Sequence, residues 1–150
     1  MKMSWMRGLV LALIVVSMLV GCGGGNGGDA ASGETALKVT GKVDQEMAWT
    51  EDEVRGMDTI EAESTNKEGE ASTYTGVPIN ALLDEAGVAG DAATLVMVAD
   101  DGYSAEVSLD EVRACDDCIV SFRNQGGFST VLPDYPGKVQ VKGVVELQVQ

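Results

Sequence analysis

Residues 76–88 read Gly76-Val77-Pro78-Ile79-Asn80-Ala81-Leu82-Leu83-Asp84-Glu85-Ala86-Gly87-Val88, which is the clearest helical pattern in this 150-residue chain. Pro78 suits the first helical position, where its missing N–H would have no partner, and Gly87 is a typical helix stop. Four apolar residues recur at helical spacing and form one stripe: Ile79, Leu82, Leu83 and Ala86. The pattern therefore predicts a helix with one buried face.

The residues after this helix are typical of strands. Thr94–Ala99 is a continuous apolar run, which predicts a strand covered on both faces. Asp100-Asp101-Gly102 predicts a turn, and residues 103–107 alternate as the hairpin partner. Residues 119–123 predict a further strand. Residues 139–150 keep their odd positions apolar or small without interruption, so we expect one long closing strand.

The residues before the helix also predict mainly strands. Residues 37–43 alternate with period two, and residues 58–64 and 71–74 can form the two sides of a hairpin. Thr50 with Glu53 three positions later has the form of a capping box, which predicts a short helix that ends near Gly56. The same signal occurs at Ser108 and Glu111 and predicts another short helix. Strands that outnumber a few short helices indicate an α+β fold.

The N-terminus has the pattern of an export signal. Lys2 and Arg7 form a positively charged start, and residues 9–20 form an apolar run that is too short to span a bilayer. Leu19-Val20-Gly21-Cys22 follows, and it resembles the bacterial lipobox, in which the cysteine is acylated after cleavage. We therefore expect residues 1–21 to be a lipoprotein signal peptide and Cys22 to carry the lipid.

Residues 22–36 are rich in glycine and have no apolar periodicity, which predicts a flexible tether. With Cys22 acylated, the protein would be anchored in the bacterial cell envelope, either on the outer face of the cytoplasmic membrane or in the outer membrane. The alternative is a plain secretory signal that leaves Cys22 free or disulfide-bonded. In both cases residues 37–150 are long enough for one domain with a single core and too short for two.

The charge is strongly acidic. The chain carries 10 basic and 24 acidic side chains, and removal of residues 1–21 would take away Lys2 and Arg7 and no acidic residue. Nucleic acid and anionic lipid are bound mainly through clusters of lysine and arginine. The composition therefore excludes nucleic acid as a partner and leaves the lipid on Cys22 as the expected contact with the membrane.

Cys115-Asp116-Asp117-Cys118 is a Cys-x-x-Cys pair in a turn-forming context. In a β-turn the first and fourth Cα atoms lie within about 7 Å, which a disulfide can bridge. For an exported protein the oxidised pair is the default expectation. Two idle thiols and a redox or metal role are the alternatives, although the two carboxylates between the sulfurs oppose thiolate formation and no histidine is present to complete a zinc site.

Other chemical motifs are weak. Histidine is absent from the chain, so a Ser-His-Asp hydrolase is excluded. Glu61 and Glu63 share one strand face, which leaves a glycosidase open but unsupported. Two acidic groups, Glu51-Asp52-Glu53 and Asp100-Asp101-Gly102, could bind calcium, but we expect them to have helix-cap and turn roles. Tyr74 and Tyr103 could line a pocket, but we expect them to have packing roles.

The order of motifs in residues 37–150 resembles the molybdopterin-binding domain of the sulfite oxidase type of oxidoreductase. The resemblance depends on the strand that ends in Gly41, the acidic helix after Trp49, the entry Gly76-Val77-Pro78 and the Asp101-Gly102-Tyr103-Ser104 hairpin. Val131-Leu132-Pro133 and Val141-Lys142-Gly143-Val144 are similar to the last strands of the family. The resemblance implies an α+β domain with a mixed, partly curled sheet and a few short helices.

The chain departs from this family at the metal site. Active members bind molybdenum through a cysteine in the segment that corresponds to residues 60–64, where this chain has Glu61, Ala62 and Glu63. They also hold the pterin phosphate with arginine and histidine, whereas residues 37–150 contain no histidine and three arginines: Arg55, Arg113 and Arg123. Where the family commonly has an arginine, the chain reads Gly127-Phe128-Ser129-Thr130. We therefore expect the fold without the cofactor.

The sequence leads to one main hypothesis of function and two alternatives. The main hypothesis is an exported, lipid-anchored module that binds or scaffolds an unknown protein or small-molecule ligand and is not an enzyme. The first alternative is a molybdopterin-dependent oxidoreductase component. The second is a thiol-disulfide protein that uses Cys115 and Cys118.

Overall fold

The computed structural model describes residues 33–150, so the expected signal peptide, Cys22 and most of the expected tether lie outside the described residues. The helices and strands of the described part are β1 (Thr35–Gly41), β2 (Met47–Thr50), α1 (Glu51–Arg55), β3 (Ile60–Thr65), β4 (Ala71–Pro78), α2 (Ile79–Ala86), β5 (Thr94–Ala99), β6 (Ser104–Ser108), α3 (Leu109–Arg113), β7 (Ile119–Phe122), β8 (Phe128–Val131), the 3-10 turn η1 (Gly137–Val139) and β9 (Lys142–Val149). The first strand begins at Thr35, two residues earlier than the alternation predicts.

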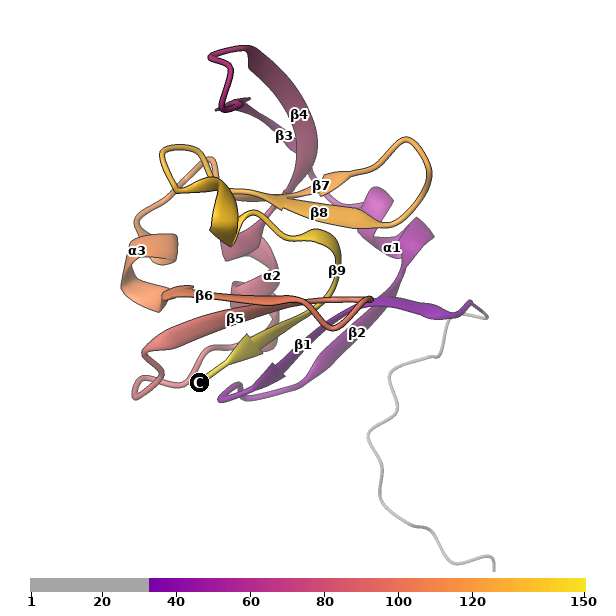
Figure 1. Cartoon of the computed structure of the whole chain (residues 1–150). Coiled ribbons are helices and arrows are strands. Elements are labelled where there is room, and N and C mark those ends of the chain that lie inside the picture. Colours follow the sequence, from indigo (N-terminus) through magenta and orange to yellow (C-terminus); the bar gives the residue numbers. More distant parts are fainter. Residues whose placement is uncertain (1–32) are drawn as a thin grey trace, which may run out of the picture. The chain divides into compact units, whose positions relative to one another are not determined.

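Within residues 33–150 the strands form one mixed sheet that branches at β9. The main path runs β2-β1-β9-β8-β7-β4-β3; off this path, β5 pairs with β9, and β6 pairs with β5. The pairing of β1 with β9 is parallel and the other pairings are antiparallel. Figure 1 shows β7 and β8 above the layer that contains β5, β9, β1 and β2. The expected mixed sheet with a few short helices is thus confirmed.

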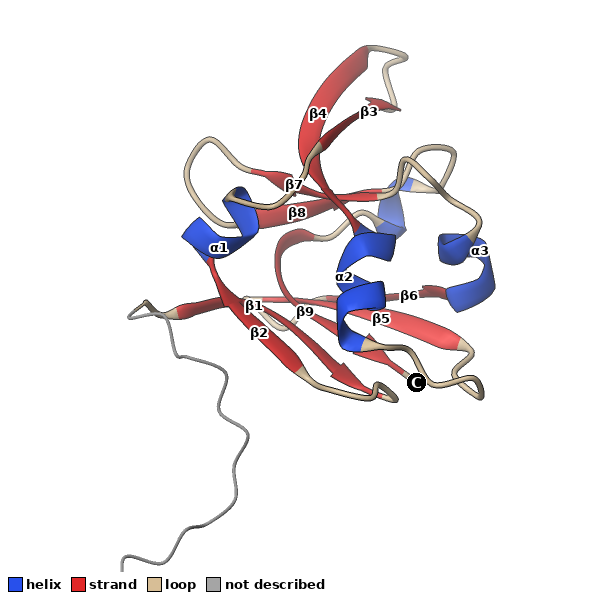
Figure 2. Ribbon diagram, turned by 180° about the vertical axis from the view of Figure 1, so that it is seen from behind, coloured by secondary structure: helices blue, strands red, loops and turns tan. Residues whose placement is uncertain are grey.

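The core lies between these strands and α2. The four residues of the predicted apolar stripe of α2 are its buried residues. They pack in one cluster with buried side chains of the central strands, which include Leu37, Val39, Leu95, Met97, Val120, Phe128 and Leu147. Figure 2 shows α2 beside the sheet, directly after the end of β4. Pro78 still pairs with Ile119 as part of β4, and the helix begins at the next residue, Ile79, so Pro78 lies near the first helical position as predicted.

The two short helices differ at their N-termini. Thr50 caps α1 with both hydrogen bonds of the predicted capping box. The box predicted for α3 is wrong, because Ser108 makes no capping bond. Ser108 pairs with Thr94 at the end of β6, and the first N–H of the helix, on Leu109, donates to the carbonyl of Ala93. A Ser108 cap would serve the N–H of Asp110 or Glu111, so the Ala93 carbonyl satisfies a different donor at the start of the helix.

Two strand predictions need correction. Leu95, Met97 and Ala99 of β5 are buried, but the alternate residues are only half-buried, so one face of this strand is fully covered and not two. The alternation is hidden in the sequence because the half-buried face also carries valines. The closing strand begins at Lys142, after η1, and its alternation is broken by a bulge near Gly143, where Val144 is buried as well.

The β3–β4 hairpin projects from the body of the domain (Figure 1). Only residues 76–78 of β4 also pair with β7. Gly76 permits that close pairing, because a Cβ atom built on Gly76 would lie 2.1 Å from the carbonyl oxygen of Val120. No helix in residues 33–150 is long and apolar enough to cross a membrane.

Candidate functional site

A hollow of about 350 Å³ lies between the β3–β4 hairpin and the strands β8 and β9. We call it the Arg123 hollow. Its walls carry hydroxyls, amides and two cationic side chains, and they consist of Ser64, Tyr74, Arg123, Gln125, Ser129, Thr130, Val131, Gln140 and Lys142. None of these residues is acidic, although the chain has 24 acidic residues.

Arg123 lies where three hollows meet. A second hollow of about 480 Å³, on the side of β4 and β7, shares Tyr74, Arg123 and Ser129 with the first and also has no acidic residue in its wall. A third, of about 450 Å³, shares Arg123 and Gln125, and it does contain one carboxylate, Asp100. Arg123 is half-buried, and neither it nor Lys142 forms an ion pair with another residue in 33–150. Both charges are therefore available to a ligand.

Buried hydrogen bonds hold the floor of the Arg123 hollow. The Thr130 hydroxyl, in a residue that is 2% exposed, accepts a 2.8 Å hydrogen bond from the Val141 N–H. The Gln140 side chain accepts from the Leu132 N–H at 2.8 Å and donates to the Leu132 carbonyl at 2.6 Å. The side chains of Thr130 and Gln140 are thus used in hydrogen bonds that hold the domain together, whereas Arg123 and Lys142 form no ion pair in residues 33–150.

The turn after Arg123 is fixed by α1. Glu51 accepts a hydrogen bond from the Gly127 N–H at 3.1 Å and pairs with Arg55 at 2.7 Å. Hydrogen bonds from Arg55 and from the Gly127 N–H lower the pKa of the Glu51 carboxyl below its ordinary value. The Arg55 guanidinium lies over the Phe122 ring, 4.8 Å from its centroid. Glu51 therefore anchors the turn to α1.

The other side chains considered from the sequence have structural or surface positions. Asp101 accepts a hydrogen bond from the Tyr103 N–H and so closes the predicted turn. The Tyr103 hydroxyl donates to the Lys138 carbonyl, whereas Tyr74 is 40% exposed and lines the Arg123 hollow. Glu61 and Glu63 are both exposed on the projecting β3–β4 hairpin.

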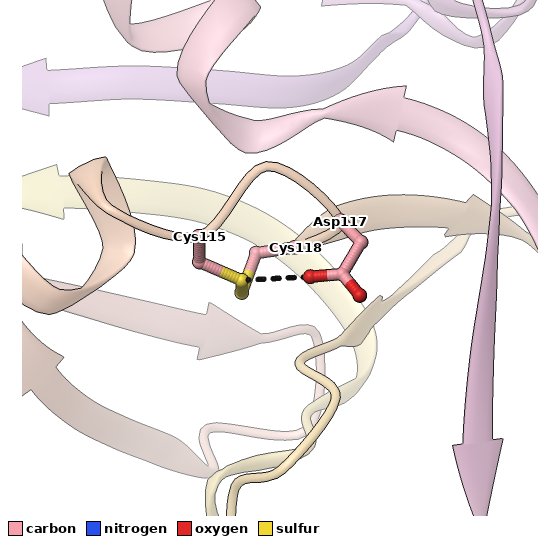
Figure 3. A group of neighbouring side chains, drawn as sticks. All are labelled: Cys115, Asp117 and Cys118. Atoms are coloured by element: carbon pink, nitrogen blue, oxygen red, sulfur yellow. Dashed lines mark hydrogen bonds between the residues drawn. A yellow bond between two sulfur atoms is a disulfide. The ribbon is translucent and has the colours of Figure 1, made fainter.

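Cys115 and Cys118 form a disulfide with Cα atoms 5.5 Å apart, in the turn between α3 and β7 (Figure 3). A carboxylate oxygen of Asp117 lies 3.3 Å from the Cys115 sulfur. A disulfide sulfur has no hydrogen to donate, so this is a close contact while the pair is oxidised. Cys115 follows the C-terminal end of α3, whereas reactive pairs commonly lie at helix N-termini. This position disfavours a thiol-exchange role.

The donor set near the Arg123 hollow does not fit a molybdenum ion held by a protein thiolate. Cys115 and Cys118 are the only cysteines in residues 33–150, and their disulfide precedes β7, whereas Arg123 follows it. About 16 Å of extended chain separates them. In β3, Ala62 packs against Ile119 and Val131, and its neighbours Glu61 and Glu63 offer only carboxylates. These are hard ligands, unlike a thiolate.

The Arg123 hollow has no continuous motif in the sequence. In the sequence, Arg123 is one of three arginines in residues 37–150, and Lys142 belongs to the predicted closing strand. The available signal was the position of Arg123 directly before the glycine-containing turn at residues 124–127. Its three-dimensional neighbours, Tyr74 and Lys142, are far from it in the sequence.

No protein-family model matches the chain, and no curated protein matches it either. The structure is similar to a chain of the crystal structure of the sulfane dehydrogenase SoxCD from Paracoccus pantotrophus, with a TM-score of 0.63 and 20% sequence identity. The match covers 75% of this chain and 37% of that chain. The matched region thus spans little more than a third of the length of that SoxCD chain. At 20% sequence identity the similarity concerns the fold alone.

Proposed function

We propose that this protein is a ligand-binding module built on the molybdopterin-domain fold of the sulfite oxidase type, and that its ligand is a small oxyanion held in the Arg123 hollow. One observation carries the proposal. In a chain with 24 acidic residues, the Arg123 hollow and the adjoining hollow on β4 and β7 have no acidic residue in their walls. The structural similarity to SoxCD supports the choice of fold.

The chemistry of the wall favours an oxyanion. The guanidinium of Arg123 offers planar N–H donors that match the oxygens of sulfate, phosphate or carboxylate groups, and Lys142 adds a second cation. The hydroxyls of Ser64, Tyr74 and Ser129 can donate further hydrogen bonds. Because the rest of the surface is acidic, an anion gains little elsewhere on this domain.

The proposal is a binding role and not catalysis. The wall of the Arg123 hollow has no carboxylate, thiol or imidazole that could act as a general base or nucleophile. The donors nearby do not fit a thiolate-held molybdenum ion. A molybdopterin-dependent oxidoreductase therefore remains the weaker candidate.

We place this module in the bacterial cell envelope, on the basis of the lipobox-like sequence that ends at Cys22. Mass spectrometry of the N-terminal peptide tests the location. We expect a peptide that begins at acylated Cys22, and we expect Cys22→Ser to abolish the lipid. An unmodified Cys22 in wild-type protein from the membrane fraction would contradict the anchor.

An NMR titration with sulfate, phosphate and thiosulfate at constant ionic strength tests the binding site. We expect saturable shifts at Arg123 and its neighbours, and about 10- to 150-fold weaker binding in Arg123→Gln, since one charge-assisted hydrogen bond contributes roughly 1.5–3 kcal/mol. Lys142→Gln should also weaken binding. The matched control is Lys38→Gln, which removes the same charge from an exposed position on β1. Equal effects of the Arg123 and Lys38 substitutions would contradict the proposal.

Elemental analysis separates the binding module from the oxidoreductase. Protein purified from a molybdenum-replete source should contain molybdenum far below one atom per chain. A stoichiometric amount would overturn the non-catalytic role and would favour a metal centre with a different ligand set.

A further inference from the structure

The Cys115–Cys118 turn brings three metal-binding groups together (Figure 3). The two sulfurs and a carboxylate oxygen of Asp117 lie within 4.8 Å of one another. Cys115 is half-buried, Asp117 is exposed, and Cys118 is 1% exposed. The group therefore opens to solvent on the side of Cys115 and Asp117.

Hydrogen bonds to the start of α2 hold both ends of this turn independently of the disulfide. The Ile79 N–H donates to the Cys118 carbonyl at 2.9 Å. The Asn80 side-chain amide lies 3.3 Å from the carbonyl of Cys115 and from the carbonyls of Val112 and Arg113. The spacing of the two cysteines should therefore persist when the disulfide is broken.

We propose that reduction of the disulfide creates a binding site for one zinc-type divalent cation, with Cys115, Cys118 and Asp117 as ligands and water at the fourth position. Two thiolates and one carboxylate are a ligand set that zinc accepts in tetrahedral geometry, with Zn–S distances of about 2.3 Å and Zn–O distances of about 2.0–2.2 Å. Soft thiolates select zinc over calcium or magnesium. The oxidised turn has no thiolate and should not bind the ion.

The charge around the turn is compatible with a cation. Arg113, two residues before Cys115, is turned to α2, where it pairs with Asp84 at 2.6 Å. The Arg113 guanidinium is thus paired with Asp84 and does not pair with Asp117. Asp116 adds a further negative charge beside the site.

The redox step needs a dithiol or phosphine reductant. A thiolate of a dithiol attacks the more exposed sulfur, that of Cys115, which breaks the Cys115–Cys118 bond and forms a mixed disulfide. The second thiol of the reductant then displaces Cys115. The turn gains two electrons and two protons, and the reductant becomes a disulfide. Zinc binding afterwards releases the two thiol protons to solvent.

Metal titration of the full chain tests the site. Cys22→Ser is used as the background, so that the pair is the only source of thiols. The protein is reduced with a phosphine, freed of it without oxygen, and titrated with zinc against a chromophoric chelator. Cobalt replaces zinc in a parallel titration, in which thiolate coordination gives a charge-transfer absorption. We expect one ion per reduced chain and none per oxidised chain.

Two matched variants identify the third ligand. Reduced Asp117→Asn should bind zinc about 10- to 100-fold more weakly, because loss of even an outer partner of a metal site has an effect of this size. Reduced Asp116→Asn removes the same charge from the next residue and should change affinity by no more than about threefold.

Three results would overturn the proposal. The first is an equal loss of zinc affinity in Asp117→Asn and Asp116→Asn. The second is tight zinc binding by the oxidised chain. The third is zinc binding that is not weakened in the double variant Cys115→Ser with Cys118→Ser. Circular dichroism checks the fold of each sample. The oxidised Cys22→Ser protein is a folded control that has no free thiol. Comparison of its zinc binding with that of the reduced protein tests the site even if the double cysteine variant does not fold.

Discussion

Glu51, the first residue of α1, accepts a hydrogen bond of 3.1 Å from the backbone N–H of Gly127, 76 positions later in the chain. The bond joins α1 to the turn between β7 and β8. Arg123 begins this turn, so its position in the wall of the Arg123 hollow depends on a hydrogen bond from α1 as well as on the pairing of β7 with β8. The same carboxylate pairs with Arg55, whose guanidinium also lies 3.4 Å from the Arg123 carbonyl.

We expect Glu51→Gln to destabilise the protein by about 0.5–1 kcal/mol near neutral pH, a modest value because the carboxylate is partly exposed. The pKa of the Glu51 carboxyl is lowered in the folded protein, so its contribution is complete above the ordinary pKa and is lost as the pH falls through the folded pKa. Urea unfolding of both proteins at about pH 7 and about pH 3 should show the difference shrink in acid.

Asp52→Asn is the control for Glu51, since it removes a charge from the same helical turn without a side-chain hydrogen bond in residues 33–150. A pH-independent effect of Glu51→Gln, or an equal effect of the two substitutions, would contradict the anchoring role.

Gly76→Ala should destabilise the domain by about 3 kcal/mol or more, because the new methyl group would meet the backbone carbonyl of Val120 at 2.1 Å and the strand pair would have to separate. Thermal or urea unfolding measures the change. Gly90→Ala is the control, since nothing lies within 4 Å of the added atom and its φ is not positive. A loss below about 1 kcal/mol at Gly76 would show that β4 and β7 adapt to the methyl group.

Thr130→Val should cost about 1–3 kcal/mol, because it leaves the N–H of Val141 without its buried acceptor while the volume is almost unchanged. Thr130→Ser retains the hydroxyl and should lose less. Hydrogen exchange at the Val141 amide provides a local measure. Faster exchange in the serine variant than in the valine variant would contradict the assignment.

Removal of the disulfide by Cys115→Ala with Cys118→Ala should destabilise the protein by no more than about 2 kcal/mol, since the closed loop is very short. Asn80→Ala should cost about 1–2 kcal/mol through its lost hydrogen bonds. The combined variant should lose more than the sum, because the turn then loses both restraints. Strict additivity in urea unfolding would show that Asn80 does not hold the turn.

Much of the secondary structure was predictable because its causes are local. The capping box at Thr50 and the stripe of α2 need only neighbours a few residues away, and both are present as predicted. The four-residue strand β2 was missed, because only Trp49 is buried in it and the strand passes directly into α1. Ser108 does occupy the N-cap position of α3, but its side chain makes no capping bond, and the first N–H of the helix is bonded by a carbonyl from a distant segment, that of Ala93.

Neighbouring residues were sufficient to predict the capping box of α1, the apolar stripe of α2, and a Cys-x-x-Cys pair close enough to form a disulfide. Which side chains line the Arg123 hollow depends on the tertiary structure. Arg123, Tyr74 and Lys142 line one hollow because the end of β7, β4 and β9 are brought together by strand pairings between distant segments. Such pairings arise from burial of a common core, which depends on the whole chain at once and has no signature within a short window.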